Sequence, residues 1–450
     1  MGNVNTATCA SFFCLLTHKK MVALPASLAA WRADTPFPTR AGLVCLVAAV
    51  QAWWVWVAVA PPIRPAKVRF AAALPVLASC CTLWAAFDPH TEIVARALSA
   101  FSFTWLGIFK VLGLILGRGP LSPTATGRAW SPAQFAFILT LPVSPRYAGG
   151  AAGGRGAGGG SAGKAPTGRT VLHRVMSRTR VSEAAAGGVR ARARVAAGKA
   201  TTLAVVVAAL EHDRTTGGAL PAALRPWCYL FGLYTFLGLT YDAIAAGAVA
   251  LPFLRLDLSP HFDHPFLATS FADLWGRRWN LIAGHSLRFL IYEPIVEGRL
   301  VAAGAEWGDG GKGRRAAAGP PPPGRPSPAR RAAALLAAFA ASGAMHEVLL
   351  AILTPGLSRY TGWWMVFFTG WAGVLAAERR AGAAWAGAGL SPIPAWLAAP
   401  LTVSAGIAAG QAGFVTPAVG TGLADRVVAS LRDAFACVGR VAARANMCFF

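Results

Sequence analysis

The sequence predicts an all-α protein, a polytopic transmembrane helical bundle of about seven to nine spans with disordered basic loops. Hydrophobic residues make up 55% of the 450 residues and charged residues only 13%. A soluble domain carries about 25% charged residues, so much of this chain is expected to lie in lipid. The net charge of +24 falls mainly between the apolar runs, as in cytoplasmic loops of membrane proteins. Since a backbone in lipid must satisfy its own hydrogen bonds, the spans are expected to be helices.

Apolar runs close to the roughly 20 residues that cross a bilayer indicate where the spans lie. The runs of this length are residues 41–59, 70–87, 97–117, 227–254, 332–353, 363–377 and 392–415. Asp242 and Pro252 interrupt the fourth run, which leaves open one tilted span or two short helices. Lys110 in the third run must snorkel or face the protein interior. Two further apolar runs, residues 134–143 and 201–210, are too short to assign as spans.

Two low-complexity segments separate these helices. Residues 146–199 contain eleven Lys or Arg and one acidic residue, with a run of Gly and Ala near the start. Residues 303–331 combine four consecutive prolines with basic residues. Neither composition can build a packed core, so both segments are predicted to be disordered loops.

The spans and loops divide the chain into seven predicted parts. These are an N-terminal segment (1–40), N-terminal transmembrane helices (41–143), a Gly/Ala/Arg-rich loop (144–200), a central transmembrane region (201–302), a Pro/Arg-rich loop (303–331), C-terminal transmembrane helices (332–415) and a tail (416–450). Apolar residues at helical spacing among Arg and Asp predict that the tail is an amphipathic helix on the membrane surface. We therefore expect a multi-pass membrane protein with the lipid bilayer as its first partner.

Other classes of partner and cofactor have little support in the residues. Aromatic side chains are not interleaved with the basic clusters and no nucleic-acid motif occurs, so nucleic acid is not predicted as a partner. The eight cysteines show no metal-ligand spacing. His261 and His264 flank Asp263, but no second carboxylate or Cys cluster supports them, which favours a loop turn. We predict no metal and no cofactor.

The first candidate for chemistry is His346, next to Glu347 inside the apolar run 332–353. A charged group at the bilayer centre costs a few kcal/mol, so such residues normally face a protein interior or a watery cavity. On a helix, Ser342 and Gly343 share the His346 face and are small enough to let another group approach. From the residues alone, catalysis and a purely structural hydrogen bond are equally good interpretations.

The second candidate is a short segment with two Trp, two Arg and one Asn. It contains Trp275, Arg277, Arg278, Trp279 and Asn280. Paired Arg side chains can bind phosphate, and the Asn amide offers both a donor and an acceptor. Composition alone favours a simpler interpretation, an interfacial helix with Trp at the headgroups and Arg on anionic lipid.

Taken together, these segments resemble the plant wax synthase branch of the membrane-bound O-acyltransferases. The matching pieces are DHPFLATS (residues 263–270), WGRRWN (275–280) and SGAMHE (342–347), with SFTWL (102–106) and RGPLSP (118–123) earlier in the chain. Motif order is kept over roughly residues 40–415, so the combination is specific although each piece is weak alone. The departures are Ala272, Leu274 and Ala344, which stand where the family tends to have Gln, Phe and Leu.

The resemblance implies transfer of a fatty acyl group from acyl-CoA to a long-chain alcohol, which forms a wax ester and releases CoA. His346 would be the general base. Asn280 would hold the acyl carbonyl or the developing oxyanion, or orient His346. Glu347 points about 100° away from His346 on a helix, so it is expected to face another helix. The substrate-binding residues implied are Trp275, Arg277, Arg278, Trp279, Ser342 and Gly343, with the two Arg on the CoA phosphates.

Acyl-CoA and a long-chain fatty alcohol are thus the expected small-molecule partners, and the endoplasmic reticulum is the expected location. Three alternatives stay open. The acceptor can instead be a sterol or diacylglycerol, because acceptor choice depends on tunnel shape. A transporter would use His346 and Asp242 as proton or substrate sites, but the inverted repeats that it predicts are not detected. A non-catalytic scaffold would use the basic loops to bind partners.

Overall fold

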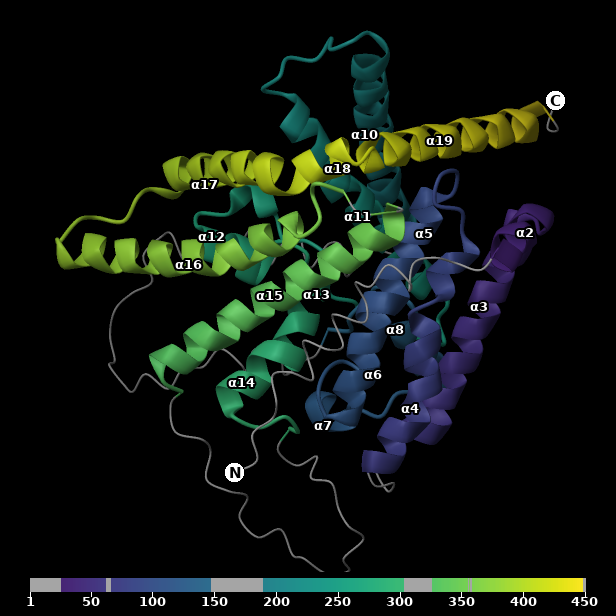
Figure 1. Cartoon of the computed structure of the whole chain (residues 1–450), viewed down its shortest axis with the longest axis horizontal. Helices are drawn as coiled ribbons and strands as arrows, with labels where there is room; N and C mark the ends of the chain where they lie inside the picture. The colour runs from purple at the N-terminus through teal and green to yellow at the C-terminus, as the bar shows by residue number, and fades with distance from the viewer. Residues whose placement is uncertain are drawn as a thin grey trace, which may run out of the picture.

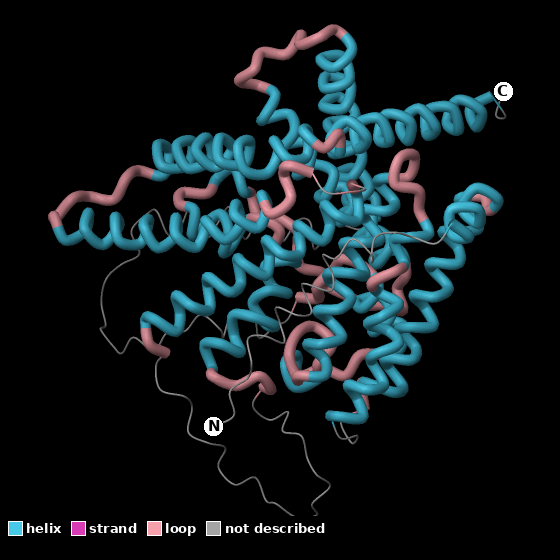
Figure 2. Tube along the Cα trace, in the orientation of Figure 1, coloured by secondary structure: helices cyan, strands magenta, loops and turns pink. Residues whose placement is uncertain are grey.

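Helices form almost all of the ordered secondary structure in this computed structural model, as Figures 1 and 2 show. The structure describes residues 26–61, 66–146, 189–302, 326–354, 356 and 358–447. Within these residues there is no β-strand, and the predicted fold class is confirmed.

The helices follow one another along the chain in three groups. The first group comprises α2 (Ala26–Asp34), α3 (Phe37–Trp54), α4 (Ala66–Cys80), α5 (Ile93–Ser99), α6 (Ile108–Ile115), α7 (Pro123–Thr126) and α8 (Pro132–Thr140). The central group comprises α10 (Val189–Thr215), α11 (Arg225–Ala250), α12 (Phe271–Asp273), α13 (Leu281–Leu287) and α14 (Glu293–Glu297). The last group comprises α15 (Pro328–Leu353), α16 (Trp363–Gly387), α17 (Ala395–Gly410), α18 (Thr416–Gly420) and α19 (Leu423–Met447).

Seven helical stretches in the described residues are long and apolar enough to cross a membrane. They are Phe37–Val59, Lys67–Ala86, Ile93–Ile115, Arg190–Thr215, Arg225–Ala250, Pro328–Leu353 and Ala395–Gly420. The fourth predicted run is one continuous helix that ends at Ala250, before Pro252. The predicted span at 363–377 lies in α16, but three successive charged residues at 378–380 leave this helix outside the seven. The tail is helical as predicted, in α19.

The boundaries predicted for the two loops are wrong at their C-terminal ends. Helix α10 begins at Val189, inside the segment 144–200, because its Ala and Arg residues are strong helix formers. Lys199 of α10 also pairs with Asp242 of α11 over 2.5 Å, which places a basic residue of the supposed loop between two spans. Helix α15 begins at Pro328, with Ser327 as its N-cap. The remaining loop residues, 147–188 and 303–325, lie outside the described part of the chain.

The N-terminal helices α3, α4, α6 and α8 gather at one side of the molecule, while α15, α16 and α17 lie at the other, with α13 between them (Figure 1). Lys110 lies in the interior of the N-terminal group, where its ammonium donates to the carbonyls of Ile138 and Leu141 over 2.6 Å each. Ile138 lies in the last turn of α8 and Leu141 is its C-cap residue, so these carbonyls lack a donor within that helix. Lys110 therefore faces the protein interior, one of its two predicted placements.

Candidate active site

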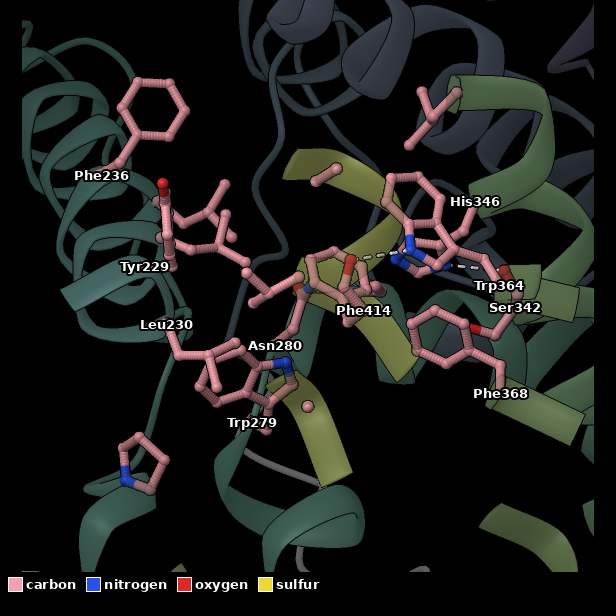
Figure 3. A pocket seen from close by; sticks show the side chains of 18 of the residues that line it. Tyr229, Leu230, Phe236, Trp279, Asn280, Ser342, His346, Trp364, Phe368 and Phe414 are labelled. Atoms are coloured by element: carbon pink, nitrogen blue, oxygen red, sulfur yellow. Dashed lines mark hydrogen bonds between the residues drawn. The ribbon is translucent and has the colours of Figure 1, made fainter. Parts of the chain in front are cut away.

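His346 and Asn280 line the same cavity of about 740 Å³. Three other predicted site residues line it as well, namely Trp275, Trp279 and Ser342. The cavity lies between helices from all three groups, and most of its lining side chains are aliphatic or aromatic. Figure 3 shows His346 and Asn280 on facing elements of this pocket. The tertiary structure thus brings together two motifs that are more than sixty residues apart in the sequence.

The imidazole of His346 has a defined tautomer. Its Nδ1 lies 2.7 Å from the carbonyl oxygen of Ser342, one turn earlier in α15 (Figure 3). A carbonyl only accepts, so Nδ1 must carry the proton and donate. In the neutral ring Nε2 then holds the lone pair, and it is the nitrogen that can accept a proton from a substrate.

Aromatic side chains enclose His346. The Phe368 ring stacks on the imidazole with centroids 3.9 Å apart and planes 20° apart. Trp105, Trp364 and Phe414 meet it edge to face, at 5.0, 5.9 and 5.8 Å. Such surroundings hold the ring in one orientation and disfavour its charged form. His346 therefore presents a neutral, oriented Nε2.

Asn280 adopts a left-handed backbone conformation, with φ 40° and ψ 61°, and is the N-cap of α13. Asn is one of the few residues other than Gly that enters this region readily. Its Oδ1 accepts the backbone N–H of Ala283 over 3.3 Å and lies 2.9 Å from His261 Nε2. Since the oxygen is occupied, the two N–H donors of the amide remain for a ligand in the cavity.

Two indole groups in the cavity lining have a buried Nε1 without a hydrogen-bond partner in the described structure. They belong to Trp275 and to Trp105. Buried donors normally have an acceptor, so each is a candidate to bind a polar atom of the substrate. Sequence reasoning did not assign Trp105 to the site. Its only signal was its position in SFTWL, one of the segments that carry the family resemblance.

The two arginines of WGRRWN, predicted to contact the CoA phosphates, both pair with Asp273 in the structure. The Arg278 side chain is only 8% exposed, and its Nε donates to Asp273 over 2.7 Å. It also donates to the carbonyls of Asp263 and His264. Arg277 is 76% exposed and pairs with Asp273 over 3.0 Å. A π-helical turn covers Leu274–Arg278, and neither Arg is among the residues that line the cavity.

Gly343, predicted as a substrate contact, lies at the contact between α15 and α16 and is not among the residues that line the cavity. A Cβ atom at this position would lie only 2.9 Å from the Cα of Met365 in α16. The missing side chain therefore lets α15 and α16 approach closely. Ser342, its neighbour, lines the cavity as predicted and fixes the His346 ring through its carbonyl.

Glu347 faces another helix, as its position relative to His346 predicted. Its carboxylate accepts the backbone N–H groups of Gly362, Trp364 and Met365 over 2.9, 2.7 and 3.1 Å. These are donors of the first turn of α16, which have no partner within the helix. Glu347 thus holds the start of the helix that carries two of the rings around His346.

Replacing Glu347 with Ala is expected to destabilise the protein by about 3 kcal/mol, because three N–H groups lose a charged acceptor. Glu347→Gln keeps one acceptor oxygen and is expected to lose about half as much. The measurement is thermal unfolding of purified protein in detergent, followed by size-exclusion chromatography. An Ala variant with an unchanged Tm would show that the cap contributes nothing.

The described residues contain no group of three His, Cys, Asp or Glu side chains that could hold a metal ion. His261 bonds to Asn280, whereas His264 pairs with Asp263 over 2.9 Å, so the two histidines do not converge. Asp242, the carboxylate that a transporter was expected to use, forms an ion pair with Lys199.

Residues 258–369 match the family model described as membrane bound O-acyl transferase family. The chain is 29% identical over 200 residues to Acyl-CoA–sterol O-acyltransferase 1 of Arabidopsis thaliana. The aligned stretch covers 44% of this chain and 47% of the relative. It is 32% identical over 132 residues to the long-chain-alcohol O-fatty-acyltransferase of Simmondsia chinensis, covering 28% and 29%. It is 46% identical over 66 residues to probable long-chain-alcohol O-fatty-acyltransferase 7 of Arabidopsis thaliana, covering 15% and 20%.

In each case the match spans less than half the length of the relative. The matched segment 258–369 includes both Asn280 and His346, and the helices around it include seven that can cross a membrane. The chain is therefore a multi-pass membrane protein whose residues 258–369 match the membrane bound O-acyl transferase family model.

Proposed function

We propose that this protein is an acyl-CoA-dependent O-acyltransferase that esterifies a long-chain alcohol to a wax ester. The observation that carries the proposal is that the side chains of His346 and Asn280 line the same, largely apolar cavity. The names of the relatives support the reaction class, because they combine an acyl-CoA or fatty-acyl group with an alcohol acceptor.

In the proposed reaction, Nε2 of His346 takes the proton of the alcohol hydroxyl as its oxygen attacks the thioester carbonyl. The amide donors of Asn280 stabilise the oxyanion that forms on the carbonyl oxygen. The tetrahedral intermediate then expels the CoA thiolate, and the proton held by His346 passes to that sulfur. The products are the ester and free CoA, and the imidazole returns to its neutral state.

The lining of the cavity suggests how the substrates are arranged. One part is lined by Gly284, His285, Arg288 and Tyr292 of the segment that follows Asn280. Arg288 is 57% exposed and pairs with Glu293 over 3.1 Å, so it can offer donors to a phosphate. We propose that the nucleotide end of CoA binds here, in place of Arg277 and Arg278.

Aliphatic and aromatic residues of α10, α11 and α19 line another part of the cavity. They include Leu203, Val207, Phe236, Val428 and Leu431. Such a surface suits hydrocarbon chains, whose transfer from water contributes about 0.8 kcal/mol per CH₂ group. A sterol acceptor is the second candidate, because one matched relative is a sterol O-acyltransferase by name. We propose the endoplasmic reticulum as the location and acyl-CoA as co-substrate without a further cofactor.

The test is expression in cells that lack neutral-lipid synthesis, with fatty alcohol, sterol or diacylglycerol supplied in separate cultures. Lipids are analysed by mass spectrometry at matched protein levels. Wax esters in the fatty-alcohol culture are the expected result. Steryl esters or triacylglycerol instead would reassign the acceptor. No new ester with any of the three acceptors would refute the proposed enzyme and favour a transporter or scaffold.

A further inference from the structure

The loop before α12 runs beside the start of α13 and is bonded to it. The backbone N–H of Asp263 donates to the carbonyl of Arg278 over 2.9 Å. In the other direction, the N–H of Leu281 donates to the carbonyl of His261 over 2.8 Å. These two bonds flank Asn280, so the loop has a fixed position relative to that residue.

The His261 side chain uses this position to contact Asn280 directly. Its Nε2 lies 2.9 Å from Oδ1 of Asn280. The same oxygen accepts the backbone N–H of Ala283, which identifies it as the carbonyl oxygen of the amide. An amide oxygen does not donate, so His261 Nε2 must carry the proton and donate. The nitrogen of the amide is thereby left as the group that can meet a ligand.

The His261 ring is held in place by aromatic neighbours. It is 3% exposed and lies nearly parallel to the rings of Phe101 and Phe262, at 6.4 and 5.1 Å. Phe101 in turn contacts Trp105, whose ring meets His346. Burial lowers the pKa of His261 to about 4, so the ring is neutral at physiological pH.

We propose that His261 is a positioning residue for the acyl transfer, whose Nε2–H locks the Asn280 amide with both of its donors turned toward the cavity. The inference rests on the proposed function. Without His261, Oδ1 keeps only the longer bond from Ala283, at 3.3 Å. The terminal amide torsion is broad and nearly two-fold, so the amide would then turn between two orientations. In one of them an oxygen would face the developing oxyanion.

Three variants separate this role from simple packing. His261→Phe and His261→Met fill the buried position with an apolar side chain that lacks the N–H donor. Since both remove the same hydrogen bond, the test needs only one of them to fold. His261→Gln supplies an amide N–H near the position of Nε2. The donor-free variant is expected to lower kcat about 10-fold or more, with KM for acyl-CoA changed less than about 2-fold. His261→Gln is expected to restore kcat to within about 3-fold of the wild type.

A double-mutant cycle completes the test, because a residue that acts through Asn280 has nothing to position once the amide is gone. In the Asn280→Gly background, the donor-free variant is expected to cause no further loss. An unchanged kcat in the donor-free single variant, or the same fold loss with and without Asn280, would overturn the inference. Absence of ester from the wild type would instead refute the proposed function and the inference with it.

Discussion

His346→Ala is expected to lower the rate of ester formation by about 10² to 10⁴, the usual contribution of a general base. The reason is that Nε2 of His346 is the proposed proton acceptor, on a ring that lines the cavity and whose tautomer is set by the carbonyl of Ser342. His346→Gln keeps a polar side chain but no basic nitrogen, so it is expected to lose as much. The measurement is kcat in detergent-solubilised protein with labelled acyl-CoA and fatty alcohol.

The control for His346 is His90→Ala, because His90 is an exposed histidine in a turn and is not among the residues that line the cavity. It is expected to leave kcat and Tm unchanged. Loss of Tm in His346→Ala would point to packing, since Phe368 stacks on that ring. Ester formation at wild-type rate by a well-folded His346→Ala protein would sink the general-base assignment.

Asn280→Asp is expected to lower kcat by about 10² to 10³, the effect of removing a donor to an oxyanion. Asp keeps an oxygen that can accept from His261 and Ala283, so the N-cap of α13 survives. It lacks the N–H donors and puts a negative charge beside the developing oxyanion. The measurement is kcat together with Tm, and Tm is expected to change little.

Asn280→Gly is the matched variant, because Gly adopts the left-handed conformation without strain and has no side chain at all. It is expected to lose activity to a similar extent while the backbone at φ 40° is retained. Ala at this position would add backbone strain to the loss of the amide and confuse the two causes. Asn280→Asp with wild-type kcat would show that the amide donors have no part in the reaction.

Much of the fold was predictable because hydropathy is a local property of the chain. Apolar runs identified most of the spans. The cost of a cation in lipid left two placements for Lys110, and the structure shows the interior one. Helix α10 was missed at its start because a basic, Ala-rich stretch reads as a loop when its partner is unknown. The ion pair that Lys199 makes with Asp242 supplies that partner only after α10 and α11 pack together.

The residue types of the candidate site were predictable, but the partners that each side chain contacts were not. His346 stood out because an ionisable residue in an apolar helix is costly, and Asn280 because of the unusual segment that it ends. Arg278 carried the same signal as a phosphate-binding residue, yet Asp273 and two backbone carbonyls surround it in a buried position. Residue type alone does not separate a cation that binds a ligand from one that is used inside the fold.

The sequence by itself determined that the chain is a helical membrane protein and that His346 is costly enough to need a reason. It did so because transfer free energies depend on each residue and its immediate neighbours. Only the tertiary structure decided that Glu347 caps α16, that Gly343 serves helix packing and that His261 holds Asn280. These are short-range contacts between separate helices and loops, and they exist only once these segments have packed against one another.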